Sequence, residues 1–458
     1  MAKYGLIGSN ITHSQSPFMH QIIGDYEYEL LEVPEESMLS EILNNKEYDG
    51  FNVTAPYKEA VIPYLDELSD LAKETKAVNT IKRMPDGKLK GYNTDVHGFV
   101  ESVGDRAKGR KCMIFGTGGA ARAVAAGLKQ VGAAEIVYVS RNPKQAQDRL
   151  GSTAKVISYD DLDLHCDTQV IVNATTVGGP DSIDKSPIIE YGKSPRLFAS
   201  LELAMDLIYN PYRTKFLQDA RRLTGCKTAS GLEMLIHQGI QSRNIWVGED
   251  KSRFFEKIAT SKIKRKILAK QLNIVAVGMP GSGKTTVFRR YAYEMHLPFF
   301  DVDKMTEELM GDTIQNVLSD SGKGEEYFRN MEHKVVLEVS RNNNSVIATG
   351  GGSILNPINR DLLRSNGIVI YVKRPLELLA TKGRPISENQ GVEELYNQRD
   401  KIYRRVSDIS IPNTETFGNS VDKNGGKNSY GYDMKVYVFH VKAIIEKYIF
   451  DIAGNKWV

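Results

Sequence analysis

A lysine and an aspartate in the first quarter of the sequence could form a proton-transfer pair. Lys58 ends the run "GFNVTAPYK", and Asp95 lies within "GYNTDVHGF". An ammonium group can donate a proton to a developing alkoxide while a carboxylate holds it in place, which is the acid that hydride transfer to a ketone requires. The structural alternative is a lysine that opens a helix and an aspartate that caps one.

Polar side chains cluster around this pair along the chain. The loop "ITHSQSPFMH" carries two hydroxyl groups directly after an expected strand, and "KAVNTI" adds an amide. The candidates in these clusters are Ser14, Ser16, Asn52, Thr54 and Asn79.

A glycine-rich turn follows at "IFGTGGAARAVA". It has the GxGxxA pattern, whose N–H groups and helix N-terminus suit a pyrophosphate. The residues of this turn are Gly116, Gly118, Gly119, Ala120 and Ala121. The next expected strand ends without the acid that would bind the 2′-hydroxyl of NAD. It is followed instead by Ser140, Arg141 and Lys144, which suit a 2′-phosphate and favour NADP, although Arg141 could be a solvated loop residue.

A second nucleotide signal lies in "VAVGMPGSGKTTVFRRY". Gly278, Gly283, Lys284 and Thr285 fill the GxxxxGK[ST] pattern between an expected strand and an expected helix. Such a loop wraps phosphates with backbone N–H groups, its lysine neutralises charge, and its hydroxyl ligates Mg²⁺. Gly281, Ser282 and Thr286 complete the expected ATP-binding set.

Acidic, basic and glycine residues follow in a definite order. The strand in "FFDVD" places Asp301 and Asp303 at the carboxyl edge of a sheet, one for the magnesium shell and one for an acceptor hydroxyl. A helix N-cap would explain one aspartate but not the pair. Arginines suit bidentate capture of a carboxylate, and consecutive glycines suit close approach of a ligand to the backbone. These residues are Arg329, Gly350, Gly351, Gly352, Arg384 and Arg399.

The elements that must position these groups alternate along the chain. Nine short apolar runs, such as "KCMIFG" and "GIVIYVK", are separated by helix-length segments, which predicts βαβ units and mostly parallel sheets. The fold class is therefore α/β. The charged stretch 248–271 lacks a strand pattern and is expected to link two halves, with a second hinge near 102–110. The segment 413–433, rich in Asn, Gly and Ser, is expected to loop out.

Composition excludes several classes of protein. The chain has 458 residues, a formal charge of +3 and three widely spaced cysteines, so neither a disulfide framework nor a zinc site is expected. The one basic run, "SKIKRKILAK", is interpreted as a solvated linker helix rather than a nucleic-acid site. No apolar run is long enough to span a bilayer, and no signal region opens the chain, so we expect a cytoplasmic protein whose partners are small molecules. Its oligomeric state is left open.

The motifs of residues 272–412 resemble those of shikimate kinase. The Walker loop, DxD, GExxFRxxE, GGG, the RP of the lid and a late RxxxY helix occur in the order of that family. The resemblance implies phosphorylation of shikimate by ATP and Mg²⁺. It makes Asp303 the group that orients or deprotonates the hydroxyl, Arg384 the lid residue over the γ-phosphate, and Thr285 and Asp301 the magnesium residues. Arg329, Arg399 and Gly350–Gly352 would hold the substrate.

Residues 4–258 resemble shikimate dehydrogenase. HSxSP, NVTxPxK, AVNT, NTD, GTGGAARAV, NAT and "GLEMLIHQ" appear in the order of that family. The resemblance implies NADPH-dependent reduction of 3-dehydroshikimate to shikimate, with Lys58 as proton donor and Asp95 as its partner. Substrate hydroxyls and carboxylate would be held by Ser14, Ser16, Asn52, Thr54, Asn79, Tyr209 and Gln238.

Together the resemblances imply a bifunctional enzyme of four parts. These are a shikimate-binding domain (1–101 with 238–258), an NADP-binding Rossmann domain (102–237), a linker (248–271) and a P-loop kinase domain with a parallel sheet (272–458). The first half would make the hydroxyl that the second half phosphorylates. Three alternatives stay open: a dehydrogenase that prefers quinate, a metabolite sensor with a weak or inactive kinase domain, and a general small-molecule kinase joined to an unrelated reductase. The kinase lid is also shorter than the family pattern, with Thr381 and Lys382 before "GRP".

Overall fold

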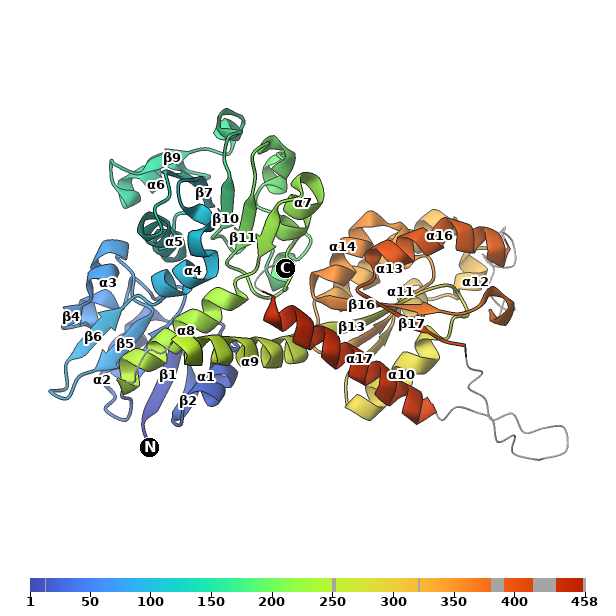
Figure 1. Ribbon diagram of the computed structural model, residues 1–458, viewed down its shortest axis with the longest axis horizontal. Coiled ribbons are helices and arrows are strands. Elements are labelled where there is room, and N and C mark those ends of the chain that lie inside the picture. Colours follow the sequence, from blue (N-terminus) through green and yellow to red (C-terminus); the bar gives the residue numbers. More distant parts are fainter. Residues whose placement is uncertain (13, 249–252, 320–321, 380–390, 415–433, 456–458) are drawn as a thin grey trace.

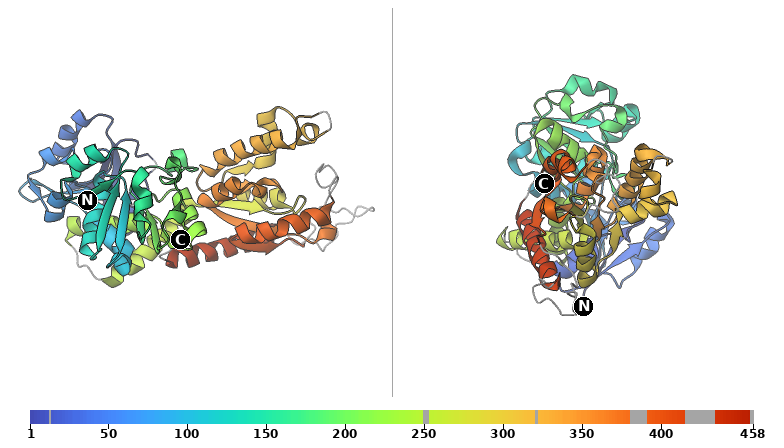
Figure 2. Two further views of the ribbon diagram at one scale, coloured as in Figure 1. Left: turned by 90° about the horizontal axis from the view of Figure 1, so that it is seen from above. Right: turned by 90° about the vertical axis from the view of Figure 1, so that its right-hand side faces the viewer.

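The computed structural model describes residues 1–12, 14–248, 253–319, 322–379, 391–414 and 434–455. They form an elongated molecule of two lobes (Figures 1 and 2). The N-terminal lobe holds two six-stranded sheets, and the C-terminal lobe holds one five-stranded sheet. Helices α9 and α17 run along the junction between the lobes (Figure 1).

The first sheet is mixed. Its strand order is β2-β1-β3-β5-β6-β4, with β1 parallel to both neighbours and β5 antiparallel to both of its own. Its strands are β1 Lys3–Gly8, β2 Glu27–Glu32, β3 Gly50–Val53, β4 Glu67–Leu68, β5 Thr80–Arg83 and β6 Leu89–Tyr92. The helices of this region are α1 Ser16–Ile23, α2 Leu39–Asn44, α3 Asp70–Thr75 and α4 Asp95–Val103.

The second sheet is a parallel, doubly wound sheet. Its order, β12-β11-β10-β7-β8-β9, reverses direction between β7 and β10, which is where ligands bind in such sheets. Its strands are β7 Lys111–Phe115, β8 Glu135–Val139, β9 Lys155–Ile157, β10 Val170–Asn173, β11 Leu203–Asp206 and β12 Lys227–Ala229. The helices are α5 Gly119–Gln130, α6 Pro143–Leu150, α7 Lys215–Thr224 and α8 Leu232–Val247, of which α8 returns to pack on α4.

The third sheet is also parallel, in the order β14-β15-β13-β16-β17. Its strands are β13 Asn273–Val277, β14 Phe299–Asp301, β15 Val346–Ala348, β16 Gly367–Lys373 and β17 Ile409–Pro412. The helices around it are α10 Lys284–Met295, α11 Val302–Met310, α12 Ile314–Val317, α13 Gly324–Ser340, α14 Pro357–Ser365, α16 Val392–Val406 and α17 Met434–Gly454.

The predicted α/β class is confirmed, and each of the nine apolar runs contains a strand. The domain boundaries stay predictions. Across the described part of the chain, none of the helices combines the length and the apolar character that a bilayer crossing needs.

Helix α9, Arg253–Gln271, is less solvated than expected. The predicted helix is confirmed, but Ala259, Ile263 and Ile267, spaced four residues apart on one face, are buried. They belong to a single apolar core that also includes residues of α1 and α8 in one lobe and of β13, α10 and α17 in the other. Lys264 is buried as well and pairs with Glu233 at 2.8 Å. The expectation of a fully solvated linker helix was wrong because periodic apolar positions lie between its charges.

Because this core joins the lobes, weakening it should affect both. We expect Ile267→Ala, at a fully buried position, to lower the free energy of unfolding by about 2–4 kcal/mol through lost burial and cavity formation. Thermal inactivation of the two halves should shift to lower temperature together. Ile258 on the same helix is 53% exposed, so Ile258→Ala is the matched control and should shift neither. Loss of only one activity would contradict a shared core.

Candidate active sites

The N-terminal lobe contains a cleft of about 880 Å³ between its two sheets. Polar residues predicted from the sequence meet there from both sides. The cleft is lined by the predicted residues Ser14, Ser16, Asn52, Thr54, Lys58, Asn79, Asp95, Gly118, Gly119, Ala120, Tyr209 and Gln238. The expected substrate residues therefore lie beside the expected nucleotide turn.

Lys58 and Asp95 form an ion pair in this cleft. The Lys58 Nζ lies 2.6 Å from Asp95 Oδ2, and the two side chains are 20% and 8% exposed. Asp95 opens helix α4, where the N–H groups of a helix N-terminus favour a carboxylate. Lys58 lies in a series of turns after β3, so the structural alternative of a lysine that opens a helix does not apply. The pair has a free face toward the cleft, where a substrate oxygen can receive the proton.

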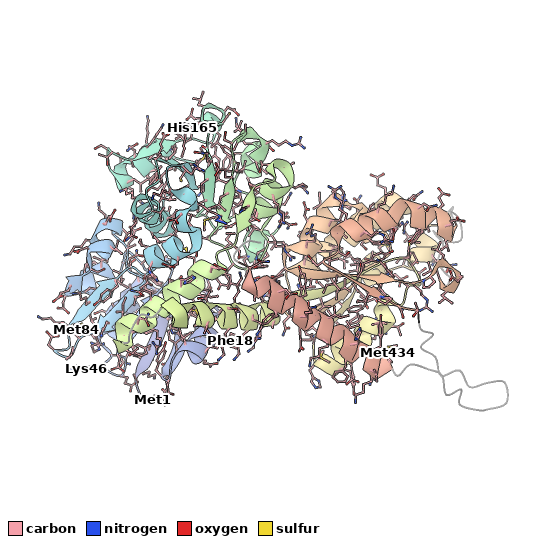
Figure 3. The ribbon with its side chains drawn as sticks, in the orientation of Figure 1. Met1, Phe18, Lys46, Met84, His165 and Met434 are labelled. Atoms are coloured by element: carbon pink, nitrogen blue, oxygen red, sulfur yellow. The ribbon has the colours of Figure 1, made fainter. Side chains whose placement is uncertain are left out.

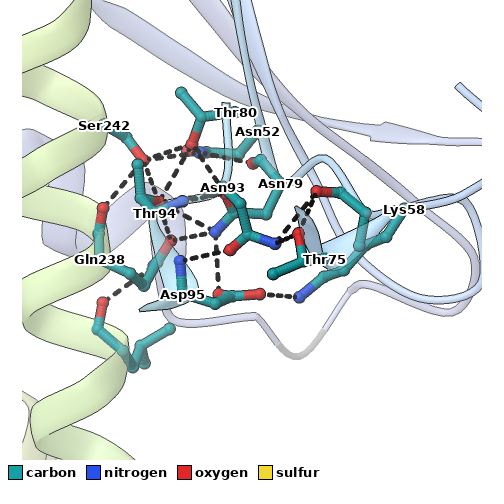
Figure 4. Close-up of polar contacts among 12 residues, drawn as sticks. Asn52, Lys58, Thr75, Asn79, Thr80, Asn93, Thr94, Asp95, Gln238 and Ser242 are labelled. Carbon is teal, nitrogen blue, oxygen red and sulfur yellow. Dashed lines mark hydrogen bonds and ion pairs between the residues drawn. The ribbon is translucent and has the colours of Figure 1, made fainter. Parts of the chain in front are cut away.

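A buried amide holds the carboxylate in place (Figure 4). Asn79 Nδ2 donates to Asp95 Oδ1 at 2.8 Å, and Asn79 Oδ1 accepts from the Thr94 N–H at 2.7 Å. Asn52 Nδ2 in turn donates to the Asn79 carbonyl at 3.1 Å. Sequence reasoning assigned no role to the hydroxyls that complete this network. They belong to Thr80, Thr94 and Ser242, and Ser242 lies one helical turn after Gln238.

The nucleotide turn has the geometry of a phosphate cradle. Gly116 has φ +108°, a value that favours glycine, and Gly118 precedes α5 with open space where a Cβ would be. A Cβ on Gly119 would lie 4.0 Å from the Cβ of Lys58, so the turn adjoins the proposed proton donor. The residues fit a pyrophosphate bound at the N-terminus of α5.

The residues expected at a 2′-phosphate lie at the end of the neighbouring strand. Gly116 N–H donates to Val139 O at 3.0 Å, so Ser140 follows directly beside the turn. Arg141 and Lys144 are exposed, which is compatible with either a phosphate contact or a solvated loop. NADP specificity of these residues stays a prediction.

Tyr209 reaches the cleft from the loop between β11 and α7. Asp206, at the end of β11, supports this loop: its carboxylate accepts from Asn173 Nδ2 at 3.0 Å, from Ile208 N–H at 3.0 Å and from Thr214 Oγ1 at 2.6 Å. Complete burial raises the pKa of Asp206 to about 7, although the three hydrogen bonds each lower it. The signal in the sequence was an aspartate that ends a buried strand, but no role was assigned to it.

In the C-terminal lobe the phosphate loop connects β13 to α10. Lys284, the first residue of α10, is buried, and its Nζ donates to Gly278 O at 2.9 Å and to Met279 O at 3.0 Å. Gly281 and Gly283 have φ of +77° and +89°. Asn413, which sequence reasoning did not assign to the site, follows β17 and donates to Ser282 O at 2.7 Å. It closes the loop from the side of β17.

The two aspartates after β14 have different settings. Asp301 caps α11 by accepting from the Lys304 N–H at 3.4 Å, so the structural interpretation applies to this residue. Its Oδ2 lies 3.7 Å from the Arg289 guanidinium. Asp303 is accessible to solvent. The protein packed around its carboxylate, together with the charge of Glu332, raises the pKa of Asp303 to about 6, and Lys284 opposes the rise.

The three glycines after β15 are surrounded by groups of the site. A side chain on Gly350 would collide with the carboxylate of Asp303, one on Gly351 with Pro280 of the phosphate loop, and one on Gly352 with the guanidinium of Arg329. The glycine run is therefore the point where the phosphate loop, the carboxylate and the arginine come together.

The arginines have unequal partners. Arg329 pairs with Glu332 at 2.9 Å and with Glu325 at 3.1 Å. Arg399 is buried, and burial lowers its pKa. Its Nε has no hydrogen-bond partner among the residues that the structure describes. A buried guanidinium with an unused donor fits a carboxylate ligand. Arg384, like Thr381 and Lys382, lies outside the described residues.

The predicted magnesium residues, Thr285 and Asp301, come from the start of α10 and the end of β14. Within the described ranges no group of three or more His, Cys, Asp or Glu side chains is placed to hold a metal ion. A hydroxyl and one carboxylate fit a cation whose remaining ligands are phosphate oxygens and water.

Comparison with known proteins agrees with these geometries. A shikimate dehydrogenase (NADP(+)) of Caldanaerobacter subterraneus is 34% identical over 279 residues, covering 56% of this chain and 95% of its own length. The chain belongs to the shikimate dehydrogenase family. The family's substrate binding domain matches residues 6–81, and a protein of Halothermothrix orenii with the same name is 38% identical over 268 residues. The solved structure of a chorismate mutase/shikimate 5-dehydrogenase fusion protein from Clostridium acetobutylicum is similar, with 35% identity, a TM-score of 0.53, and coverage of 58% of this chain and 98% of its own.

The C-terminal half matches a second family. The shikimate kinase family model matches residues 280–423, which include the phosphate loop from Pro280 onward, the glycine run, and Arg329 and Arg399. The chain thus joins a shikimate dehydrogenase to a shikimate kinase domain, as an oxidoreductase and phosphotransferase of the shikimate pathway that uses NADP and ATP. The alternative of an unrelated reductase joined to a general small-molecule kinase is excluded.

The glycine run gives a steric prediction for the kinase half. We expect Gly350→Ala to lower phosphorylation of shikimate by about 10²-fold or more, because the methyl group displaces Asp303 and Glu332. The oxidation of shikimate by NADP⁺ should not change. Gly454→Ala, at a position with open space, is the control in the same half. Full kinase activity of Gly350→Ala would show that Asp303 does not need its present position.

Asp206 gives a prediction on pH. Its folded pKa of about 7 exceeds the ordinary 3.8, so between these values the folded state holds a proton that the unfolded state has lost. The contribution of Asp206 to stability is thus fully present below pH 4 and is lost as pH rises to 7. Asp206→Asn keeps a carbonyl for Asn173 and Ile208 and an N–H for Thr214. We expect urea unfolding at pH 5 and 7 to show a smaller loss of stability in this variant than in the unaltered protein. Asp184→Asn, at an exposed residue, is the control: its loss of stability between pH 5 and pH 7 should equal that of the unaltered protein.

Proposed function

We propose that the dehydrogenase half reduces 3-dehydroshikimate to shikimate with NADPH, and that the kinase half phosphorylates the 3-hydroxyl of that shikimate. The observation that carries the first step is the Lys58–Asp95 pair at 2.6 Å, in a cleft shared with the nucleotide turn. NADPH, when bound, supplies the hydride to the carbonyl carbon. Lys58 donates the proton to the carbonyl oxygen, Asp95 holds the ammonium, and Asn79 holds Asp95.

The polar side chains that line the cleft account for recognition of a polyhydroxylated acid. They come from five segments of the chain and line the same cleft as Lys58. We assign substrate binding to Ser14, Ser16, Asn52, Thr54, Asn79, Tyr209 and Gln238. Arg141 and Lys144, with Ser140, are assigned to the 2′-phosphate of NADP.

For the kinase step, Asp303 accepts the proton of the attacking hydroxyl while Lys284 contacts the phosphates. Arg329 and Arg399 bind the substrate carboxylate, supported by the unused donor of Arg399. Mg²⁺ would be held by Thr285 and Asp301 and would offset phosphate charge. The backbone at Gly350–Gly352 allows close approach of the substrate. Arg384 is proposed to cover the γ-phosphate.

Two substitutions should separate the activities. We expect Lys58→Ala to lower NADPH-dependent reduction of 3-dehydroshikimate by about 10²–10⁴-fold, because the general acid is lost. Phosphorylation of added shikimate should stay unchanged. Lys284→Ala should lower phosphorylation by about 10²-fold or more, because a cation at the phosphates is lost, and leave reduction unchanged. Each variant controls for the folding of the other.

A coupled assay on the whole chain measures both steps. It supplies 3-dehydroshikimate and NADPH, follows nicotinamide absorbance, and then adds MgATP and detects shikimate 3-phosphate. Faster oxidation of quinate than of shikimate would favour the quinate alternative. Binding of shikimate without turnover in either step would favour the sensor.

A further inference from the structure

The loop that carries Tyr209 is held from the kinase half. Gln271, the last residue of α9, is buried, and its Nε2 donates to the backbone carbonyl of Tyr209 at 2.7 Å. The same Nε2 lies 3.1 Å from Asn366 Oδ1, which precedes β16 of the kinase sheet. Asn366 Nδ2 donates to the backbone carbonyl of Gln271 at 3.0 Å, so the Asn366 side chain contacts both the side chain and the backbone of Gln271.

The next residues of the loop extend this attachment. Tyr212 N–H donates to Asn366 Oδ1 at 3.3 Å, and Arg213 N–H donates to Ser365 O at 2.8 Å. The Arg213 guanidinium donates to Gly367 O at 3.0 Å and to the hydroxyl of Tyr448 at 3.2 Å. Tyr448 belongs to α17 and donates to Asp408 Oδ1 at 3.0 Å, and Asp408 also lies 3.5 Å from Arg213.

The other side of Tyr209 faces the first substrate loop. The backbone N–H of Gln15, between Ser14 and Ser16, faces the Tyr209 phenol. Burial raises the pKa of Tyr209, and the contact with this N–H acts in the opposite direction. Helix α1, which begins at Ser16, also contacts α9, because Lys270 Nζ lies 4.0 Å from the centre of the Phe18 ring (Figure 3). Contacts from α9 and the kinase sheet therefore reach two of the segments that line the dehydrogenase cleft.

We infer that Gln271 is a positioning residue of the dehydrogenase, through which the kinase half fixes Tyr209 against bound shikimate. This inference rests on the proposed dehydrogenase function. Gln271 touches no substrate. Its hydrogen bond to the Tyr209 carbonyl fixes the position of the Tyr209 backbone. The backbone in turn places the Tyr209 ring between the cleft and the loop at Ser14–Ser16.

The test is the oxidation of shikimate by NADP⁺ in the full chain. Gln271→Met keeps the volume of the side chain and removes its donor. We expect the KM for shikimate to rise by about three- to tenfold, which corresponds to the loss of one hydrogen bond. Both kcat and the KM for NADP⁺ should stay the same. The kinase KM for shikimate should also stay the same. This split distinguishes positioning from general destabilisation, which would lower both activities.

Arg222→Met is the matched control. Arg222 pairs with Asp361 of the kinase half at 2.9 Å in the same interface, but on α7 rather than on the Tyr209 loop. It should leave the KM for shikimate unchanged. Tyr448→Phe is a milder second variant, because it removes only the hydroxyl that contacts Arg213 and Asp408. It should raise the dehydrogenase KM in the same direction, although the residue lies in the last helix of the kinase half.

Two results would overturn the inference. If the unaltered protein oxidises shikimate but the KM is unchanged in Gln271→Met, positioning through Gln271 is wrong and the proposed function stands. If Arg222→Met raises the KM for shikimate as much as Gln271→Met and Tyr448→Phe do, the interface affects the dehydrogenase through overall stability and not through the position of Tyr209. Absence of shikimate oxidation by the unaltered protein would overturn the proposed dehydrogenase function, and this inference with it.

Discussion

Burial of the apolar face of α9 is the constraint on which the arrangement of the two halves depends. Helix α9 carries seven lysines and arginines, yet one of its faces is apolar. Ile263 and Ile267 on that face are fully buried, in a core that both lobes contribute to. Once that face is buried, Lys264 is buried as well and requires Glu233 as a partner. The remaining contacts between the halves, including those at Gln271 and Arg213, form around this packed helix.

Both sites use the same property of parallel sheets. Strands β7 and β13 each end in a glycine-rich turn, and the helix that follows presents its N-terminal N–H groups to a phosphate. What differs is the group placed beside the turn. In the dehydrogenase an ammonium–carboxylate pair lies next to Gly119, whereas in the kinase a carboxylate lies against Gly350. In the proposed mechanism the first arrangement supplies a proton and the second accepts one.

Much of this could be predicted from the sequence, because glycine turns and strand-end polar residues act through local geometry. The parallel strands, the phosphate loop and the Lys58–Asp95 pair are examples. Residues whose role depends on distant partners could not be predicted. Asn413 acts by reaching Ser282, and Gln271 by reaching Tyr209, across separations that no local pattern encodes. The buried face of α9 was visible as a four-residue spacing, but the charges between its apolar positions concealed it.

The junction between α9 and β13 also bears on how shikimate travels. Helix α9 ends at Gln271 and β13 begins at Asn273, so Leu272 alone connects them, and it is buried. A covalent tether carries an intermediate only where it can swing, and a single buried residue gives this junction no freedom to do so. Under the proposed function, shikimate would therefore pass between the two sites by diffusion rather than on a moving segment at the α9–β13 junction.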